Sequence, residues 1–131
     1  MADNESMSDI EKVIDKIKEC LKSKKMIVLA HREVNKKTAE EFGILSTNLS
    51  KLIIDKLKAS DHIEGPVPDD NEERNKKYPG DVYKFDVDMS HLNYGRIYFK
   101  IKFQKQPDEL NVMYLIVISV HKKNMTSQRS G

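Results

Sequence analysis

The chain has one cysteine, no long apolar run and no basic leader, and each of these absences excludes a class of protein. Because Cys20 is alone, it cannot form a disulfide within the chain, and its place on an expected apolar helix stripe predicts a buried, inert thiol. No apolar stretch approaches the ~20 residues that a membrane-spanning helix needs. The acidic segment 1–6 lacks the features of a signal peptide. The sequence therefore predicts a cytoplasmic protein with no membrane partner.

Motifs for cofactors and metals are also missing. The chain has neither a Gly-x-Gly-x-x-Gly segment nor a P-loop, so nucleotide-cofactor chemistry is unsupported. His31 and His91 have no cysteine or second histidine at the spacing of zinc ligands. The segment 69–73 resembles a calcium loop in charge alone, since it lacks spaced ligands and a central glycine. We predict no cofactor and no metal.

The length of 131 residues predicts a single domain, with flexible tails at 1–8 and 124–131. The composition, 38% hydrophobic and 34% charged, is that of an ordinary globular chain. A net charge of +2 is too small to indicate a nucleic-acid partner by itself. Any such partner must therefore be inferred from where the cations lie.

The segment 95–103 carries the clearest pattern, because alternate side chains of a strand point to opposite faces of a sheet. One face is apolar. The other carries three cations and a phenol with no acid, which suits a phosphate polyanion. The apolar positions are Ile97, Phe99, Ile101 and Phe103, and the polar positions are Arg96, Tyr98, Lys100 and Lys102.

Two further strands complete this surface. The nearly unbroken apolar run 111–121 predicts a buried strand, joined to the basic strand by a hairpin around Pro107. We expect its even positions, 112 to 120, to pack in the same core as Phe99, which places Ser119 and His121 beside Tyr98. The strand 81–88 adds one more cation from its own polar face. The predicted face consists of Lys84, Arg96, Tyr98, Lys100, Ser119 and His121.

The amino-terminal half predicts helices at 8–22, 35–42 and 46–57, with a short strand at 26–30 between the first two. A short edge strand is expected near 61–64, and the polar segment 65–80 is expected to be an irregular loop beside the active face. The predicted fold class is therefore α+β, with the helices packed on one face of a small antiparallel sheet and the other face free.

The order of these elements, with the segments 81–83, 95–100 and 117–119, resembles the MqsR (motility quorum-sensing regulator) toxins. The resemblance spans about residues 10–123. It implies a RelE-like fold and the toxin role in a type II toxin-antitoxin module, with metal-free cleavage of mRNA and a cognate antitoxin as partner. A functional tyrosine of that family falls on Tyr98. Two other family positions, a catalytic lysine and a glutamine, fall on Glu64 and Gly80 here.

Metal-free RNA cleavage needs a base for the 2'-hydroxyl proton, cations for the phosphate and an acid for the leaving oxygen. His121 is the natural proton carrier, since imidazole titrates near neutrality. We expect Tyr98 and Arg96 to complete the catalytic set by contacting the phosphate. His62 and Glu64 are possible assistants at the edge of the site. The expected RNA-binding residues are Lys84, Lys100, Lys102, Ser119 and Lys122.

Two alternatives stay open on the sequence alone. The basic side chains also fit an ordinary solvated sheet face with Tyr98 lying across it. A non-catalytic RNA-binding or partner-binding protein with the same fold is favoured by Glu64 and Gly80, whereas His121 beside Tyr98 favours an enzyme.

Overall fold

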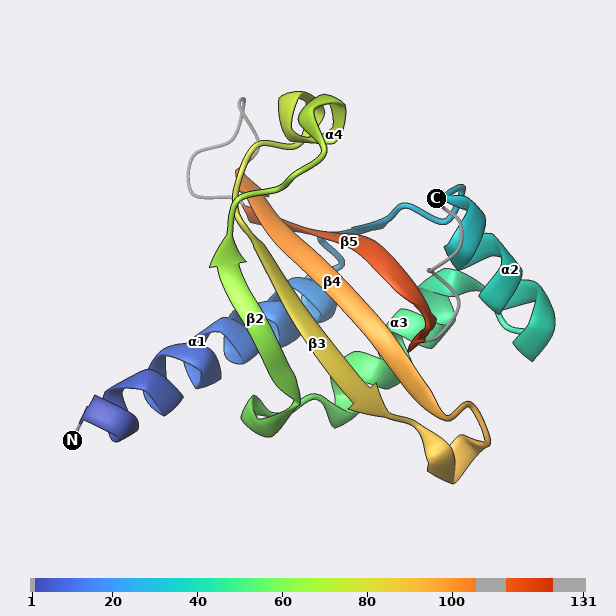
Figure 1. Cartoon of the computed structure of the whole chain (residues 1–131), viewed down its shortest axis with the longest axis horizontal. Helices are drawn as coiled ribbons and strands as arrows, with labels where there is room; N and C mark the ends of the chain where they lie inside the picture. Colours follow the sequence, from blue (N-terminus) through green and yellow to red (C-terminus); the bar gives the residue numbers. More distant parts are fainter. Residues whose placement is uncertain (1, 106–112, 124–131) are drawn as a thin grey trace.

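The order of elements expected from the sequence is present in a computed structural model, which describes residues 2–105 and 113–123 (Figure 1). The four helices are α1 (Ala2–Lys22), α2 (Glu33–Phe42), α3 (Ser46–Lys56) and α4 (Glu72–Lys77). The strands are β1 (Met26–Val28), β2 (His62–Val67), β3 (Val82–Asp88), β4 (Arg96–Lys105) and β5 (Met113–Lys122), with two short 3-10 turns, η1 (Ala59–Asp61) and η2 (Ser90–Leu92). Helix α1 includes residues 2–8, which the sequence assigned to a flexible tail, whereas the expected tail at 124–131 lies outside the described residues.

The strands form one sheet in the order β1-β5-β4-β3-β2. Strands β2 to β5 pair antiparallel, which confirms this part of the sequence-based expectation, and β2 is the edge strand expected near 61–64. The expectation of an entirely antiparallel sheet is wrong, because β1 pairs parallel to β5. A parallel neighbour needs a long connection between the two strands, and here the chain passes through α2, α3 and three other strands. The fold is therefore α+β with a mixed sheet.

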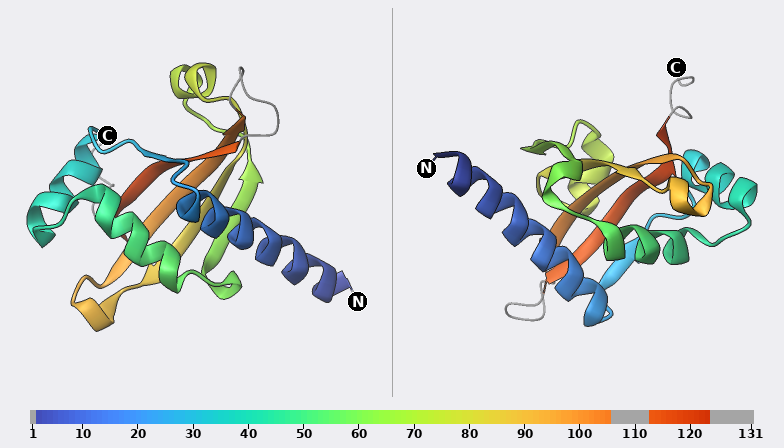
Figure 2. Two further views of the ribbon diagram at one scale, coloured as in Figure 1. Left: turned by 180° about the vertical axis from the view of Figure 1, so that it is seen from behind. Right: turned by 90° about the horizontal axis from the view of Figure 1, so that it is seen from below.

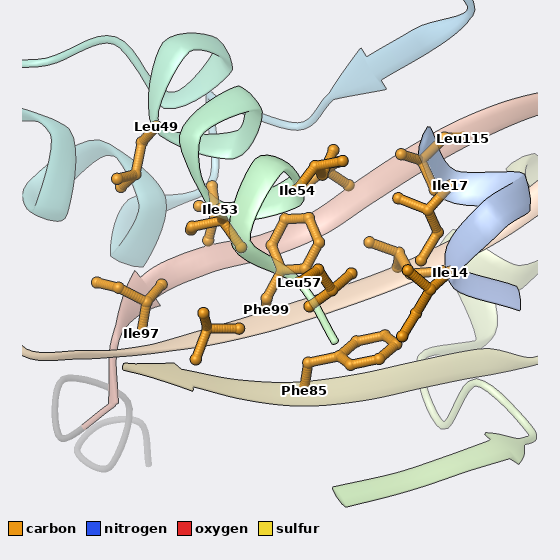
Figure 3. Packing of buried hydrophobic residues seen from close by; sticks show 14 of the residues in the cluster. Ile14, Ile17, Leu49, Ile53, Ile54, Leu57, Phe85, Ile97, Phe99 and Leu115 are labelled. Atoms are coloured by element: carbon orange, nitrogen blue, oxygen red, sulfur yellow. The ribbon is translucent and has the colours of Figure 1, made fainter. Parts of the chain in front are cut away.

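Helices α1 and α3 cross one face of the sheet (Figure 2). Their apolar stripes bury Ile17 and Ile53 completely against Phe85 and Phe99 of the sheet (Figure 3). Ile97 and Ile101 lie in the same cluster, so the predicted apolar face of β4 is confirmed. Cys20 is also buried there, as its place on the helix stripe predicts.

Strand β5 differs from the sequence-based expectation because it contains a β-bulge at Ile118. Lys100 pairs with Ser119, but the next residue, Ile101, pairs with Val117. A bulge inserts one unpaired residue, so the side chains on its two sides alternate in opposite phase. The expectation that all even positions of β5 face the main core is therefore wrong. Val120 does, but on the other side of the bulge the core residues are Leu115 and Val117.

The face of the sheet opposite α1 and α3 is only partly open, contrary to the expectation of a free face. At one end, a second apolar cluster of Leu29, Val82, Ile116 and Ile118 is packed by Val67, Tyr78 and Tyr114 among others. The segment 65–80 covers this end and is not the irregular loop expected. It includes the end of β2 and the short helix α4, whose start is capped by Asn71 accepting a bond from the Arg74 amide at 2.8 Å. A six-residue charged helix has no apolar stripe, so periodicity could not reveal it.

Helix α2 continues the edge of the sheet where β1 ends. Its buried Asn35 donates from Nδ2 to the carbonyls of Leu29 and Ile118, both at 2.9 Å, and accepts from the Val120 amide at 2.9 Å. Thr38 Oγ1 accepts from the Lys122 amide at 3.1 Å. Polar side chains of a helix thus take the place of a neighbouring strand, which satisfies the backbone groups of β5.

We expect Asn35→Ala to lower the free energy of unfolding by about 3 kcal/mol, since three buried hydrogen bonds at about 1 kcal/mol each are lost. Urea unfolding at neutral pH measures this difference. Lys36→Ala, next along the same helix at an exposed position, should change little. An equal effect of both substitutions would show that Asn35 does not seal this edge.

Candidate active site

Tyr98 and His121 lie side by side on the face opposite α1 and α3. They are direct cross-strand partners on β4 and β5, and their ring centroids are 5.3 Å apart with the planes inclined at 46°. The prediction that they share a face is confirmed, because the bulge at Ile118 lies before this pair and leaves its register as expected. A phenol and an imidazole therefore meet at the centre of the candidate site.

The imidazole of His121 is held in one orientation by the backbone. Its Nδ1 lies 2.9 Å from the carbonyl oxygen of Lys122, and a carbonyl only accepts, so Nδ1 carries the hydrogen and the lone pair of the neutral ring is on Nε2. In the described part of the chain Nε2 has no hydrogen-bond partner. The residue as a whole is only 1% exposed, so the imidazole is almost completely buried.

The surroundings favour the neutral form of His121. Burial lowers the pKa of its imidazole from 6.5; the hydrogen bond to the Lys122 carbonyl raises it by less than burial lowers it, and the charges of Arg32 and Lys100 lower it further. At neutral pH the ring is therefore uncharged, with Nε2 able to accept a proton.

This lowered pKa predicts that acid destabilises the protein before the carboxylates titrate. Below pH 6.5 the unfolded chain binds a proton at His121 that the folded chain does not, so the free energy of unfolding falls as the pH decreases. Urea unfolding between pH 7.5 and 5 should show this slope. We expect the slope to shrink in His121→Gln and to persist in the exposed control His91→Gln; an unchanged slope in His121→Gln would refute the assignment.

Arg32 joins this pair from the loop between β1 and α2, where no sequence pattern indicates its role. Its Nη1 donates to the Ile118 carbonyl at 2.8 Å and to Ser119 Oγ at 2.7 Å. The guanidinium is half-buried, and its charge acts on both Tyr98 and His121. Ser119, expected to bind RNA, is itself buried and instead orients Arg32.

Lys100 lies on the same face, next to Tyr98 along β4 and opposite Ser119 on β5. Its side chain is half-buried, and among the described residues its ammonium has no carboxylate partner. Burial lowers the pKa of Lys100 to about 8, with a further contribution from the charge of Arg74. Lys100 is thus a cation at neutral pH that releases its proton more readily than an ordinary lysine.

The other cations that the structure describes on this face form ion pairs with carboxylates of the neighbouring strands β2 and β3. Lys84 contacts Glu64 at 2.8 Å. Asp86 receives Arg96 at 2.8 Å and Lys123 at 2.6 Å. Of the cations beside Tyr98, Arg32 and Lys100 thus form no direct ion pair with a carboxylate among the described residues, although the charge of Asp69 acts on both at longer range.

Three predicted site residues are paired or buried and so are not free to contact RNA as expected. Arg96, predicted to grip phosphate, is held by Asp86 and lies 3.9 Å from Asp88 as well. Lys102 is 0% exposed, so it has no surface to offer RNA, and it pairs with Asp69 at 2.9 Å. Lys122 points to the opposite face, because it neighbours His121 along the strand, and it contacts Glu41 of α2 at 2.8 Å.

The two possible assistants are also not brought to the centre. His62 packs edge-on against the core residue Phe85, with 5.6 Å between the ring centroids, and its Nε2 lies 2.9 Å from the Gly65 carbonyl oxygen. Glu64 is exposed and engaged with Lys84. The structure therefore brings together Tyr98, His121, Lys100 and Ser119 of the predicted set and adds Arg32.

No family model, curated protein or solved structure matches this chain in the comparisons. Among the described residues, no group of three or more histidine, cysteine, aspartate or glutamate side chains is placed to hold a metal ion. None of the helices within 2–105 and 113–123 has the length and apolar character needed to cross a membrane.

Proposed function

We propose that this protein is a metal-independent endoribonuclease that cleaves mRNA at the site formed by Arg32, Tyr98, Lys100 and His121. The observation that carries the proposal is the placement of two half-buried cations, which form no ion pair with a carboxylate among the described residues, beside a neutral, oriented histidine. Burying an unpaired cation is costly, and a protein keeps such groups where an anion binds. A phosphate of RNA is an anion of the right chemistry.

In this proposal, the 2'-oxygen attacks phosphorus while His121 Nε2 takes the hydroxyl proton. The new 2'-oxygen to phosphorus bond forms as the bond from phosphorus to the 5'-oxygen breaks, and the leaving oxygen takes a proton from the Lys100 ammonium. The products are a 2',3'-cyclic phosphate and a 5'-hydroxyl. Tyr98, whose pKa is raised by burial, stays protonated and donates to the phosphate, while Arg32 stabilises its growing negative charge.

In this site Arg32 takes the phosphate-binding role that the sequence analysis assigned to Arg96. We expect Arg32→Gln to reduce cleavage of a long mRNA by ~100-fold or more, the usual effect of removing one charge-stabilising donor. Arg96→Gln, which removes a guanidinium already held by Asp86, should leave cleavage nearly unchanged. The assay is run with a chelator throughout; activity lost to the chelator, or greater sensitivity to Arg96→Gln, would contradict the proposal.

The resemblance to the MqsR toxins supports a cellular role as the toxin of a toxin-antitoxin module. A toxin of a type II module acts on mRNA in the cytoplasm and is neutralised by a cognate antitoxin, which we propose as the protein partner. Growth arrest on expression of the chain alone, relieved by Arg32→Gln, would support this role. A gene for the antitoxin beside this one is a further expectation.

The alternative is a non-catalytic RNA-binding or protein-binding member of the same fold. The near-complete burial of the His121 side chain favours it, as does the presence of Glu64 and Gly80 where the resembled family has functional side chains. Such a protein would bind RNA without cleaving it. Binding that depends on Arg32 and Lys100, with no cleavage by the wild type, would establish the alternative.

A further inference from the structure

A cavity of about 290 Å³ lies next to the candidate site, between the β1–α2 loop and α4. Leu29 and Tyr78 contribute apolar surface to it, since both belong to the second apolar cluster. Arg32 and Arg74 also line it, with the guanidinium of Arg74 paired to Asp69 at 2.6 Å. Its volume is near the lower end of the range for small-ligand sites, ~300 Å³. The cavity therefore combines an apolar part with cations at the scale of a single small ligand.

Arg32 connects this cavity to the Tyr98–His121 pair. It lines the cavity, yet its Nη1 is fixed on Ser119 and Ile118 and its charge acts on Tyr98 and His121. A guanidinium has five N–H donors, and the bonds to β5 come from Nη1 alone, so donors remain for a ligand on the other side. A molecule bound at Arg32 can thus contact both the cavity and the Tyr98–His121 pair.

The remaining lining residues offer hydrogen bonds of both kinds. Glu73 is a carboxylate and only accepts. Asn71 uses its Oδ1 for the Arg74 amide, so its NH2 group remains as a donor. Lys77 adds a cation, with its Nζ 5.5 Å from the centroid of the Tyr78 ring. An apolar contact surface with an acceptor and a donor beside it suits a nucleobase, whose faces are apolar and whose edges are polar.

We propose that this cavity holds the nucleotide next to the cleaved bond, with its base against Leu29 and Tyr78 and its phosphate at Arg32. This assignment rests on the proposed function, because it takes the ligand to be a unit of RNA. Glu73 and Asn71 are then the residues that determine which base is preferred.

The test follows backbone amide signals by NMR while each of the four nucleoside 3'-monophosphates, ribose 5-phosphate or inorganic phosphate is added to the full chain. We expect the nucleotides to shift the signals of Leu29, Asn71 and Tyr78, and the two base-free phosphates to shift Arg32 without them. Nucleotides that leave Asn71 and Tyr78 unchanged would refute the inference.

Exposed positions of α4 provide matched variants. Glu73→Gln should change the order of affinity among the four nucleotides by about fivefold for at least one, because an amide donates where a carboxylate only accepts. Lys77→Ala should weaken all four similarly. Glu72→Gln and Lys76→Ala, on the same helix but outside the cavity lining, are the controls, and equal effects there would overturn the assignment.

The two proposals can fail separately. Nucleotides that bind the cavity of a protein that cleaves no RNA would leave a nucleotide site and remove the enzyme. Cleavage that depends on Arg32 and His121, with unchanged base preference in Glu73→Gln and no nucleotide-induced shifts in the cavity, would keep the enzyme and remove this site.

Discussion

Replacing His121 by asparagine is expected to reduce RNA cleavage by ~100- to 10,000-fold, the range for loss of a general base. The reason is geometric: Nδ1 is committed to the Lys122 carbonyl, so Nε2 is the nitrogen left to accept the 2'-hydroxyl proton. Because the pKa of His121 is lowered, the wild type should also keep its activity as the pH drops to 6.5, and lose it only as the pH falls through the lower folded value. Single-turnover cleavage of a long mRNA with chelator measures both effects.

Since His121 is buried, the variant must be shown to be folded. Its thermal unfolding and its binding of uncleaved RNA should stay near those of the wild type. His91→Asn, at an exposed position in η2, is the matched control and should cleave normally. If a folded His121→Asn variant stays active, another group must take the 2'-hydroxyl proton. Lys100 is then the next candidate because of its pKa of about 8.

Asp69→Asn is expected to cost about 3–5 kcal/mol of unfolding free energy, the usual effect of removing one partner from a buried ion pair. The Asp69 carboxylate is completely buried and receives Lys102 at 2.9 Å and Arg74 at 2.6 Å. Its loss leaves the fully buried Lys102 ammonium without a counter-charge. Urea unfolding measures the effect, and Asp70→Asn, one residue along and exposed, is the control.

The reverse substitution should cost less. Lys102→Met removes the cation but leaves Asp69 paired with Arg74, which donates to it from both Nε and Nη2 at 2.8 and 2.6 Å. The same pairing keeps the pKa of Asp69 well below its ordinary value. A larger loss of stability in Lys102→Met than in Asp69→Asn would show that the lysine contributes mainly through its bond to the Tyr78 carbonyl.

The parts of the fold that follow from alternation could be predicted from the sequence. The apolar face of β4, the pairing of β3 with β4 and the meeting of Tyr98 with His121 depend on local period-2 patterns and on antiparallel register. The helices with strong apolar stripes, α1 and α3, were equally clear. Their positions follow from one requirement, the burial of a stripe against a sheet.

What could not be predicted depends on contacts between distant segments. The bulge at Ile118 cannot be recognised in the sequence, because the strand is apolar on both faces. The switch in which positions of β5 face the main core was therefore not predicted. Lys102 and Lys100 hold equivalent places in the alternation of β4. They differ because Asp69, from a separate segment, pairs with the buried Lys102, whereas Lys100 has no carboxylate partner within 2–105 and 113–123. Arg32 lies in a short loop without periodicity, and no local pattern indicates its role.

The bulge at Ile118 has an implication for how this chain can change over time. Arg32 and Asn35 both donate to the carbonyl of that residue, and Ser119 beside it holds the same guanidinium. Deleting Ile118 would restore regular alternation with Val117 and Ser119 still opposite Ile101 and Lys100, yet it would remove the carbonyl that anchors Arg32 and Asn35. Selection should therefore keep the bulge for the contacts that it makes with Arg32 and Asn35, whereas conservative substitutions of the apolar side chains of β5 remain tolerable.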